Sequence, residues 1–299
     1  MSFSAQVKEE LCRVNPGHKG CYQALCYGVL LYCNTFSGRE IKIMTENRSF
    51  VQALPRLFKR AFALNFDEVP ADMDRPGKLI FRITNPEKTE QIFQTYGYSA
   101  KTPVHHINLG VLENECCRRS FMRGAFLAGG SVTDPARQYH LELVTDHYNV
   151  RGETYALLQE LGFSPKQTDR SGNYITYFKQ SDAISDFLTA IGAAVSAMEV
   201  ISARIEKDVR NSVNRKVNCD TANVTKTVEA AMEQTEAIRK LEQAGLLEGL
   251  PEKLRQTARM RMDNPEMSLS ELASALDPPV TKSCLNHRLR KLMALAESL

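Results

Sequence analysis

The sequence lacks the features of an exported or membrane-embedded protein. Its first residues, MSFSAQVKEEL, mix charges and contain no apolar core, so they do not resemble a signal peptide. No uninterrupted apolar run is long enough to span a bilayer. These absences predict a soluble, cytoplasmic protein without a membrane partner.

The sequence also lacks a strong net charge. Its formal charge is +3 at pH 7 over 299 residues, which is too small to indicate or exclude a nucleic-acid partner. The hydrophobic content of 43% and charged content of 24% are ordinary for a soluble protein, and the length suggests roughly two domains. The distribution of the basic residues therefore matters more than their number.

The eight cysteines include no CxxC pair. Scattered cysteines in a cytoplasmic chain are usually reduced, small apolar core residues. His18 with Cys21, Cys26 and Cys33 is one conceivable set of zinc ligands. The spacings are irregular, however, and Cys26 and Cys33 fall within an apolar helix. We therefore expect no metal and no cofactor.

One segment, FMRGAFLAGGSV at positions 121–132, combines small and apolar residues with a glycine stop. Gly124 leaves room for a second helix to approach, and Gly129 with Gly130 can end the helix. A related segment, CYGVLLYCNTFS at positions 26–37, aligns with it at an offset of 96 residues (28 to 124). This offset suggests an internal repeat.

Further elements recur at nearly the same offset. In each half an apolar helix is followed by a short alternating strand and then by a second helix. These elements are expected at 50–63, 79–84 and 86–96, and again at 154–161, 174–178 and 181–191. The order predicts an α+β domain over residues 1–200, built from duplicated αββαββα repeats at about 18–97 and 114–192.

This pattern resembles the LAGLIDADG homing-endonuclease fold, in which two such helices pack at a pseudo-two-fold axis. In nucleases of that family each motif helix ends in an acidic residue, and the two carboxylates hold divalent metals that activate water. The corresponding positions are Cys33 and Gly129. Neither supplies the oxygen ligand that magnesium requires. The resemblance therefore implies the fold without its nuclease chemistry, and we expect no catalytic residue.

The surface residues of this domain do not decide between DNA and protein as its partner. Arg118 and Arg119 are interpreted equally well as phosphate contacts or as the solvated start of a helix. The alternating strand at 139–145 carries His140 and Glu142 on one face, which weakens the case for DNA contact. The domain is expected to contact either DNA or protein.

His105 and His106 are adjacent in a polar loop. Because neighbouring side chains diverge on an extended chain, they are expected to be two surface histidines and not one ligand site.

From residue 201 to 248 the sequence becomes a polar, helical connector. Between positions 204 and 216 the sequence contains five basic and two acidic residues. Such a segment suits a hinge, a DNA-backbone contact, a docking surface or a solvated linker. The residues expected to make an auxiliary DNA or interdomain contact are Arg210, Asn211, Asn214, Arg215 and Lys216.

Residues 249–299 carry the clearest local signals. A helix over 250–262 begins at a proline and ends at Asn264 and Pro265. Ser268 and Glu271 form the pattern of a capping box, which opens a short helix. A turn at 277–280 then leads to a last helix that reaches about residue 297. Two helices joined by so short a turn, the second of them basic, predict a helix-turn-helix.

The last helix separates into two faces. Leu285, Leu289, Leu292 and Ala296 share one side at 100° per residue and are expected to pack inward. The opposite side carries residue types that bond base edges or phosphates. The DNA-binding residues expected there are Thr281, Lys282, Ser283, Asn286, His287, Arg288, Arg290 and Lys291. A solvated basic face is the alternative.

Four strings along the chain resemble the WhiA family: MSFSAQVKEEL, CCRRSFMRGAFLAGGSV, RNSVNRKVNCDTAN and KSCLNHRLRKL. The resemblance implies a degenerate LAGLIDADG domain joined to a helix-turn-helix similar to sigma-factor region 4. It also implies transcriptional regulation connected with cell division, chromosome segregation and, in some relatives, sporulation. One departure is that the first motif helix lacks the glycine expected after it.

The predicted function is a non-enzymatic, sequence-specific regulator that binds promoter DNA in the nucleoid as a monomer. The expected protein partner is another transcription regulator or an RNA polymerase sigma factor. A protein-interaction scaffold of the division apparatus is the alternative. An active endonuclease is the third hypothesis, although Cys33 and Gly129 oppose it.

Overall fold

A computed structural model describes residues 2–99 and 104–299. The chain divides into two compact units, residues 1–207 and 208–299, and one continuous helix, α8 (Ala194–Gln243), crosses the boundary between them. Within the described ranges, every helix is too short or too polar to cross a membrane.

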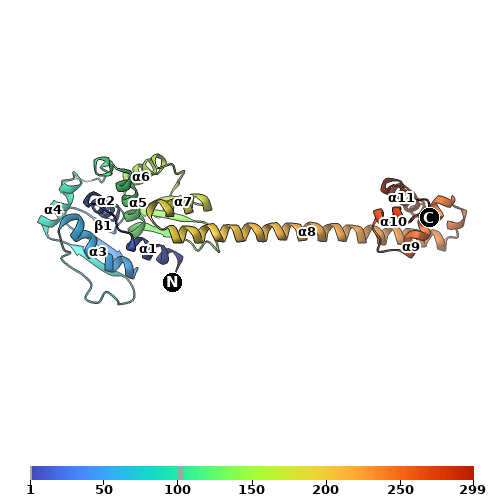
Figure 1. Ribbon diagram of the computed structural model, residues 1–299, viewed down its shortest axis with the longest axis horizontal. Helices are drawn as coiled ribbons and strands as arrows, with labels where there is room; N and C mark the ends of the chain where they lie inside the picture. Colours follow the sequence, from blue (N-terminus) through green and yellow to red (C-terminus); the bar gives the residue numbers. More distant parts are fainter. Residues whose placement is uncertain (1, 100–103) are drawn as a thin grey trace. The chain divides into compact units, whose positions relative to one another are not determined.

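The N-terminal unit contains the predicted duplication (Figure 1). It opens with α1 (Phe3–Arg13). The first repeat then comprises α2 (Lys19–Leu31), β1 (Thr35–Phe36), β2 (Ile41–Thr45), α3 (Arg48–Phe62), β3 (Leu79–Ile83) and α4 (Pro86–Thr95). After a short 3-10 turn at Leu109–Leu112, the second comprises α5 (Glu115–Gly129), β4 (Gly130–Val132), β5 (Leu141–Thr145), α6 (Tyr148–Glu160), β6 (Lys166–Arg170), β7 (Asn173–Phe178) and α7 (Ser181–Ile191).

The two antiparallel sheets differ by one strand. The first has the order β1-β2-β3, and the second has the order β4-β5-β7-β6. In the first repeat a bridge between Glu68 and Arg82 stands beside β3, where the second repeat has a full strand. Pro70 and Pro76 lie in the connecting segment, and proline cannot donate to a strand ladder. The predicted αββαββα repeat is thus complete only in the second half.

Helices α2 and α5 cross at the centre of this unit, as the glycine pattern predicted. A Cβ atom on Gly28 would lie 2.1 Å from the Phe121 carbonyl oxygen, and one on Gly124 would lie 1.9 Å from the Leu25 carbonyl oxygen. Only hydrogen at both Cα atoms allows this approach. The crossing therefore depends on the glycine of each repeat.

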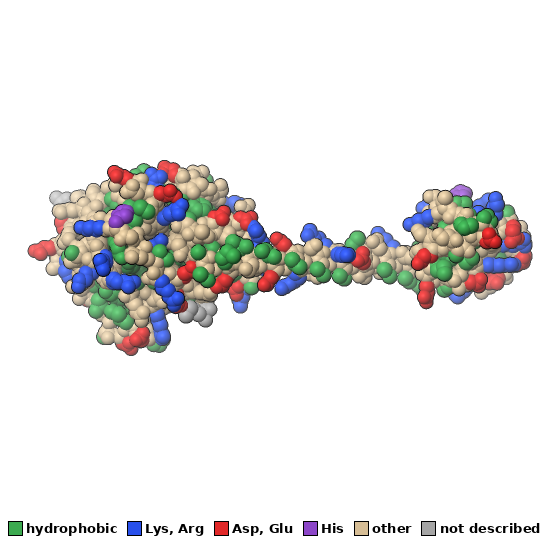
Figure 2. All heavy atoms as spheres, in the orientation of Figure 1, with side chains coloured by type: hydrophobic (Ala, Val, Ile, Leu, Met, Phe, Trp, Pro, Cys, Tyr) green, Lys and Arg blue, Asp and Glu red, His purple; other side chains and the backbone are tan. Residues whose placement is uncertain are grey.

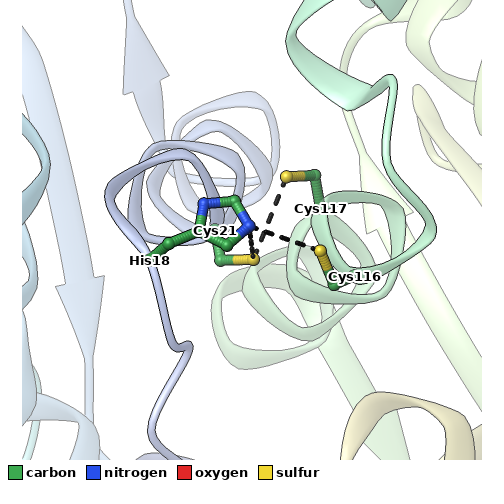
Figure 3. A group of neighbouring side chains, drawn as sticks. All are labelled: His18, Cys21, Cys116 and Cys117. Carbon is green, nitrogen blue, oxygen red and sulfur yellow. Dashed lines mark hydrogen bonds between the residues drawn. The ribbon is translucent and has the colours of Figure 1, made fainter.

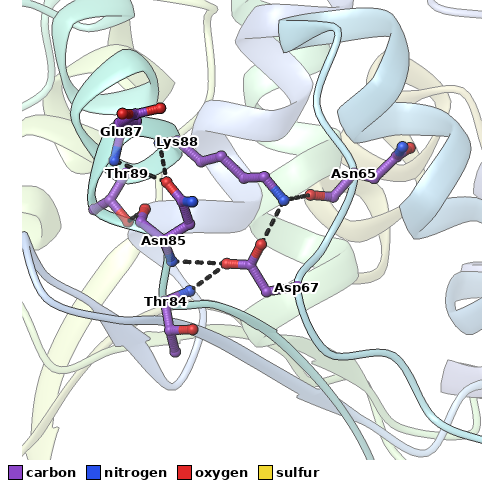
Figure 4. Close-up of polar contacts among 7 residues, drawn as sticks. All are labelled: Asn65, Asp67, Thr84, Asn85, Glu87, Lys88 and Thr89. Carbon is purple, nitrogen blue, oxygen red and sulfur yellow. Dashed lines mark hydrogen bonds and ion pairs between the residues drawn. The ribbon is translucent and has the colours of Figure 1, made fainter.

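A polar cluster fixes the junction between β3 and α4 (Figure 4). The Asp67 carboxylate accepts hydrogen bonds from the backbone N–H groups of Thr84, at 2.7 Å, and Asn85, at 2.8 Å. It also pairs with Lys88, whose ammonium donates to the Asn65 carbonyl oxygen at 3.0 Å. Asn85 in turn caps α4. The cluster joins the irregular segment before β3 to the helix after it.

The prediction of two surface histidines is wrong for His105. Its side chain is buried, its Nε2 lies 2.6 Å from the Phe36 carbonyl oxygen, and its ring stacks on Phe36. Burial lowers the pKa of His105. His106 is exposed and pairs with Glu153 instead. The two rings diverge as expected, but tertiary packing draws one of them inward.

The C-terminal unit confirms the predicted helices. After a 3-10 turn at Leu247–Gly249 come α9 (Glu252–Asp263), α10 (Leu269–Ala275) and α11 (Lys282–Glu297). Their buried leucines form a core separate from that of the N-terminal unit. Arg261 is buried within α9, and its guanidinium donates to the Met267 carbonyl oxygen at 2.8 Å. This bond holds the loop that leads into α10.

Candidate nucleic-acid interface

Local hydrogen bonds fix the starts of α10 and α11. The Ser268 side chain accepts from the Glu271 backbone N–H, and the Glu271 carboxylate accepts from the Ser268 N–H at 2.8 Å. These bonds form the predicted capping box and lower the pKa of Glu271. The Val280 N–H then donates to the Ala273 carbonyl oxygen at 2.9 Å, and Thr281 caps α11. Both helix starts are therefore fixed by their own sequence.

The two faces of α11 are as predicted. Leu285, Leu289 and Leu292 are almost fully buried, and Ala296 completes the inward face. The opposite side consists of exposed or half-buried residues. Exposed are Thr281, Lys282, Ser283, His287, Arg290 and Lys291; half-buried are Asn286 and Arg288. A buried leucine row thus holds a polar, basic surface toward solvent.

The cationic side chains of α11 differ in whether they already have a polar partner within the protein. Within the described residues, Lys282, Arg290 and Lys291 form no salt bridge with an acid. Arg288 packs back toward α9, where its Nη1 lies 3.5 Å from the Thr257 hydroxyl. Three positive side chains therefore remain available to an anion, and the fourth is partly held by the domain itself.

The neighbouring helix α9 does not offer the same free charge. Glu248 pairs with Arg255 at 3.1 Å and with Arg259 at 2.9 Å. Hydrogen bonds from Arg259 and Arg255 lower the pKa of Glu248, and the bond to Glu248 raises the pKa of Arg255. Figure 2 shows both acidic and basic side chains on this unit. Arg255 and Arg259 on α9 thus have acidic partners, which Lys282, Arg290 and Lys291 on α11 lack among the described residues.

The connector residues lie on α8. Arg210, Asn211, Asn214, Arg215 and Lys216 are all exposed. At 100° per residue the first four fall within one side of the helix, whereas Lys216 projects from another. The connector is thus a regular helix with a polar side.

Cys33 and Gly129 occupy the positions that correspond to the acids of LAGLIDADG nucleases. The Cys33 thiol donates to the carbonyl oxygens of Leu30, at 3.1 Å, and Thr35, at 3.2 Å. Burial raises its pKa to about 12, so the thiol stays neutral. A Cβ atom on Gly129 would lie 2.4 Å from the Val144 carbonyl oxygen. Neither position offers a carboxylate, and Gly129 leaves no space for one.

Strand β5 shows why the sheet is a weaker candidate for DNA contact. Glu142 pairs with His140 and Arg170 at 3.2 Å each, so the basic side chains there already have an acidic partner. Arg118 pairs with Glu160 and Arg119 with Glu115.

The structure also assembles a cluster that the sequence did not predict. His18 and Cys21 lie together, but their neighbours are Cys116 and Cys117 and not Cys26 and Cys33. Cys26 is wholly buried in the middle of α2. The missed signal was the repeat itself, because Cys21 and Cys117 are separated by the same 96 residues as Gly28 and Gly124.

Comparison with known proteins agrees with this architecture. The family model described as the WhiA LAGLIDADG-like domain matches residues 118–210, and that of the WhiA C-terminal HTH domain matches residues 213–296. The crystal structure of full-length DUF199/WhiA from Thermatoga maritima is similar with a TM-score of 0.61 and 26% identity, covering 100% of this chain and 99% of the other.

Two curated relatives extend over nearly the whole chain. A probable cell division protein WhiA from Ruminiclostridium cellulolyticum is 39% identical, covering 99% of this chain and 97% of the relative. One from Clostridium acetobutylicum is 36% identical, covering 100% of this chain and 98% of the relative. With both domain models matched and this identity over its full length, the chain belongs to the WhiA family.

Proposed function

We propose that this chain is a sequence-specific DNA-binding regulator in which α11 reads the bases. The observation that carries the proposal is the two-sided geometry of α11, with a buried leucine row opposite exposed residues able to bond base edges. Arg290 suits guanine O6 and N7, and Asn286 suits adenine N6 and N7. Ser283 and His287 lie on the same side.

Phosphate contacts would come from the remaining α11 residues. Lys282 and Lys291 are exposed and unpaired among the described residues, so they can approach the DNA backbone without breaking an ion pair. Thr281 and the first turn of α11 add a helix N-terminus, which favours anions. Arg288 contributes less freely because it also contacts Thr257.

We assign the exposed polar side of α8 an auxiliary role. Arg210, Asn211, Asn214 and Arg215 share that side, and Lys216 lies apart from them. Their charge supports contact with the DNA backbone or with another domain, and it carries no base specificity.

We also propose that the protein has no nuclease activity. LAGLIDADG catalysis requires two carboxylates at the ends of the motif helices, and Cys33 and Gly129 provide none. Incubation of the protein with supercoiled plasmid and Mg²⁺ or Mn²⁺ should leave the plasmid intact. Metal-dependent nicking that copurifies with the chain would contradict this assignment.

The names of the relatives support a proposal for the cellular role. Their names associate WhiA proteins with cell division, and we propose that this chain regulates promoters of division, segregation or sporulation genes as a cytoplasmic, nucleoid-associated monomer. A second regulator or a sigma factor is the proposed protein partner. Selection of bound genomic fragments by the full chain, followed by sequencing, tests the proposal. Enrichment of a recurring motif supports it, and uniform recovery contradicts it.

A protein-interaction scaffold is the second candidate, and one observation favours it. Helix α8 exposes a row of valines on one side, which Figure 2 shows as hydrophobic side chains along the helix. The row comprises Val209, Val213, Val217, Val224 and Val228. If substitution of Val213 and Val217 by glutamate abolishes the division phenotype while substitution of Arg290 and Lys291 leaves it intact, the scaffold explains the protein better.

A further inference from the structure

Four potential metal ligands meet between the N-terminal ends of α2 and α5 (Figure 3). His18 Nε2 lies 3.4 Å from Cys116 Sγ and 3.2 Å from Cys21 Sγ. Cys21 Sγ lies 3.9 Å from Cys117 Sγ. All four donor atoms are within 4.8 Å of one another. Among residues 2–99 and 104–299, this is the one group of three or more His, Cys, Asp or Glu residues that could hold a metal ion.

Three of the six separations between the donor atoms are close to the edges of a zinc coordination tetrahedron, and the other three are at most 4.8 Å. Bond lengths of about 2.3 Å to sulfur and about 2.0 Å to nitrogen give edges of about 3.8 Å between two sulfurs and about 3.5 Å between sulfur and nitrogen. The observed edges of 3.2, 3.4 and 3.9 Å lie close to these values. We propose that His18, Cys21, Cys116 and Cys117 form a structural Cys3His site for zinc(II).

The ligand types favour zinc over the ions of the related nucleases. Soft thiolates and imidazole select zinc, whereas magnesium requires oxygen ligands. Four protein ligands also complete the tetrahedron, which leaves no open position for water or substrate. The site is therefore structural and does not restore nuclease activity.

The surroundings suit a negatively charged centre. Three thiolates and one divalent ion carry a net charge of about −1. Arg123 on α5 is only 7% exposed, and its charge acts on Cys21. Its Nε donates to the Ile191 carbonyl oxygen at 2.6 Å, but its Nη1 has no hydrogen-bond partner in the described part of the chain. A thiolate centre supplies this buried cation with a counter-charge.

The helix dipoles also support thiolates at this place. The ligands lie at the first turns of α2 and α5 or just before them, where the helix dipoles favour negative charge.

The site joins the two repeats. Each repeat provides two ligands, and Cys21 and Cys117 are equivalent under the repeat offset. Cys33 and Gly129, at the positions of the nuclease acids, lie at the opposite ends of the same two helices. Cys33 comes just after α2, and Gly129 is the last residue of α5. The ion would fasten the entry of the helix pair, while Gly28 and Gly124 allow the close crossing at its middle. Binding releases the thiol protons to solvent.

The test measures metal content on the full chain, grown with added zinc and purified under reducing conditions without chelator. We expect about one zinc per chain. After zinc removal, titration with Co²⁺ should give the absorption of tetrahedral cobalt with thiolate-to-metal charge transfer. Cys116→Ser and His18→Gln alter exposed residues, so the fold should survive both changes. Each should weaken cobalt binding at least about 10-fold. Loss of a partner in the outer coordination shell alone already weakens metal binding by about this factor.

The matched controls are Cys219→Ser and Cys284→Ser, which replace exposed cysteines on α8 and α11 and should bind cobalt as the unaltered chain does. A reduced chain that binds neither zinc nor cobalt would overturn the proposal. So would unchanged binding in both ligand variants, or a metal-free Cys21–Cys117 disulfide in the freshly purified protein. Because DNA binding is not the readout, these results are independent of the proposed regulatory function.

Discussion

Replacement of Gly124 by alanine is expected to destabilise the N-terminal unit strongly. The added Cβ would lie 1.9 Å from the Leu25 carbonyl oxygen and 3.0 Å from the Val29 nitrogen. Ordinary contact begins at 3.4 Å, so α2 and α5 would have to separate by about 1.5 Å. The obstructing atoms belong to the backbone and cannot rotate away.

The expected loss of stability follows from the cost of overpacking. Overpacking a core typically costs about 1–3 kcal/mol, and a backbone obstruction belongs at the upper end, so we expect about 3 kcal/mol for Gly124→Ala. Gly152 on α6 provides the matched control, because a Cβ there meets nothing within 4 Å. Gly152→Ala should stabilise the unit by about 0.5–1 kcal/mol through helix propensity.

The aromatic composition provides an assay specific to this unit. The chain has ten tyrosines and no tryptophan, and every tyrosine precedes residue 208. Tyrosine fluorescence during urea unfolding therefore reports on the N-terminal unit alone. The midpoint for Gly124→Ala should fall by about 1 M urea or more. If Gly124→Ala and Gly152→Ala unfold alike, the close helix crossing is refuted.

Three further predictions concern local features. Thr281→Ala removes the side-chain cap of α11 and should cost the C-terminal unit about 1 kcal/mol, seen as a lower melting temperature by circular dichroism at an unchanged N-terminal transition; an unaltered melting temperature would contradict the cap. Leu289→Ala opens the buried face of α11 and should cost about 2–5 kcal/mol, whereas Leu299→Ala, at an exposed position, should cost almost nothing. Burial lowers the pKa of His105 below its ordinary value of 6.5, so as the pH falls below 6.5 the unfolded chain binds the proton first and stability decreases. The urea midpoint should therefore drop between about pH 7 and 5, and it should drop less in His105→Gln. An equal drop in both proteins would refute the role of His105 in this pH dependence.

Local signals made the C-terminal unit predictable from sequence. The Ser268 and Glu271 capping box, the turn at 277–280 and the leucine spacing of α11 each depend on residues close in sequence. The crossing of α2 and α5 was predictable for another reason, since Gly28 and Gly124 repeat at one offset.

Features set by distant contacts were not predictable in this way. His105 is buried because Phe36, far away in sequence, offers a ring and a carbonyl oxygen. The Cys3His cluster needs α2 and α5 to be placed side by side before its ligands meet. The bridge that replaces a fourth strand in the first sheet likewise depends on the pairing of Glu68 with Arg82.

The central claim is that the exposed side of α11 specifies the DNA sequence. The most direct measurement is the affinity of the full chain for its selected fragment and for a scrambled fragment over a series of salt concentrations. Arg290→Ala with Lys291→Ala should lower the preference for the selected fragment by about 1–3 kcal/mol and reduce the salt slope by about 1–2. Lys253→Ala with Arg259→Ala removes the same charge from α9 and should retain the preference. An unchanged preference in the α11 variant, or an equal loss in the α9 variant, would contradict the claim.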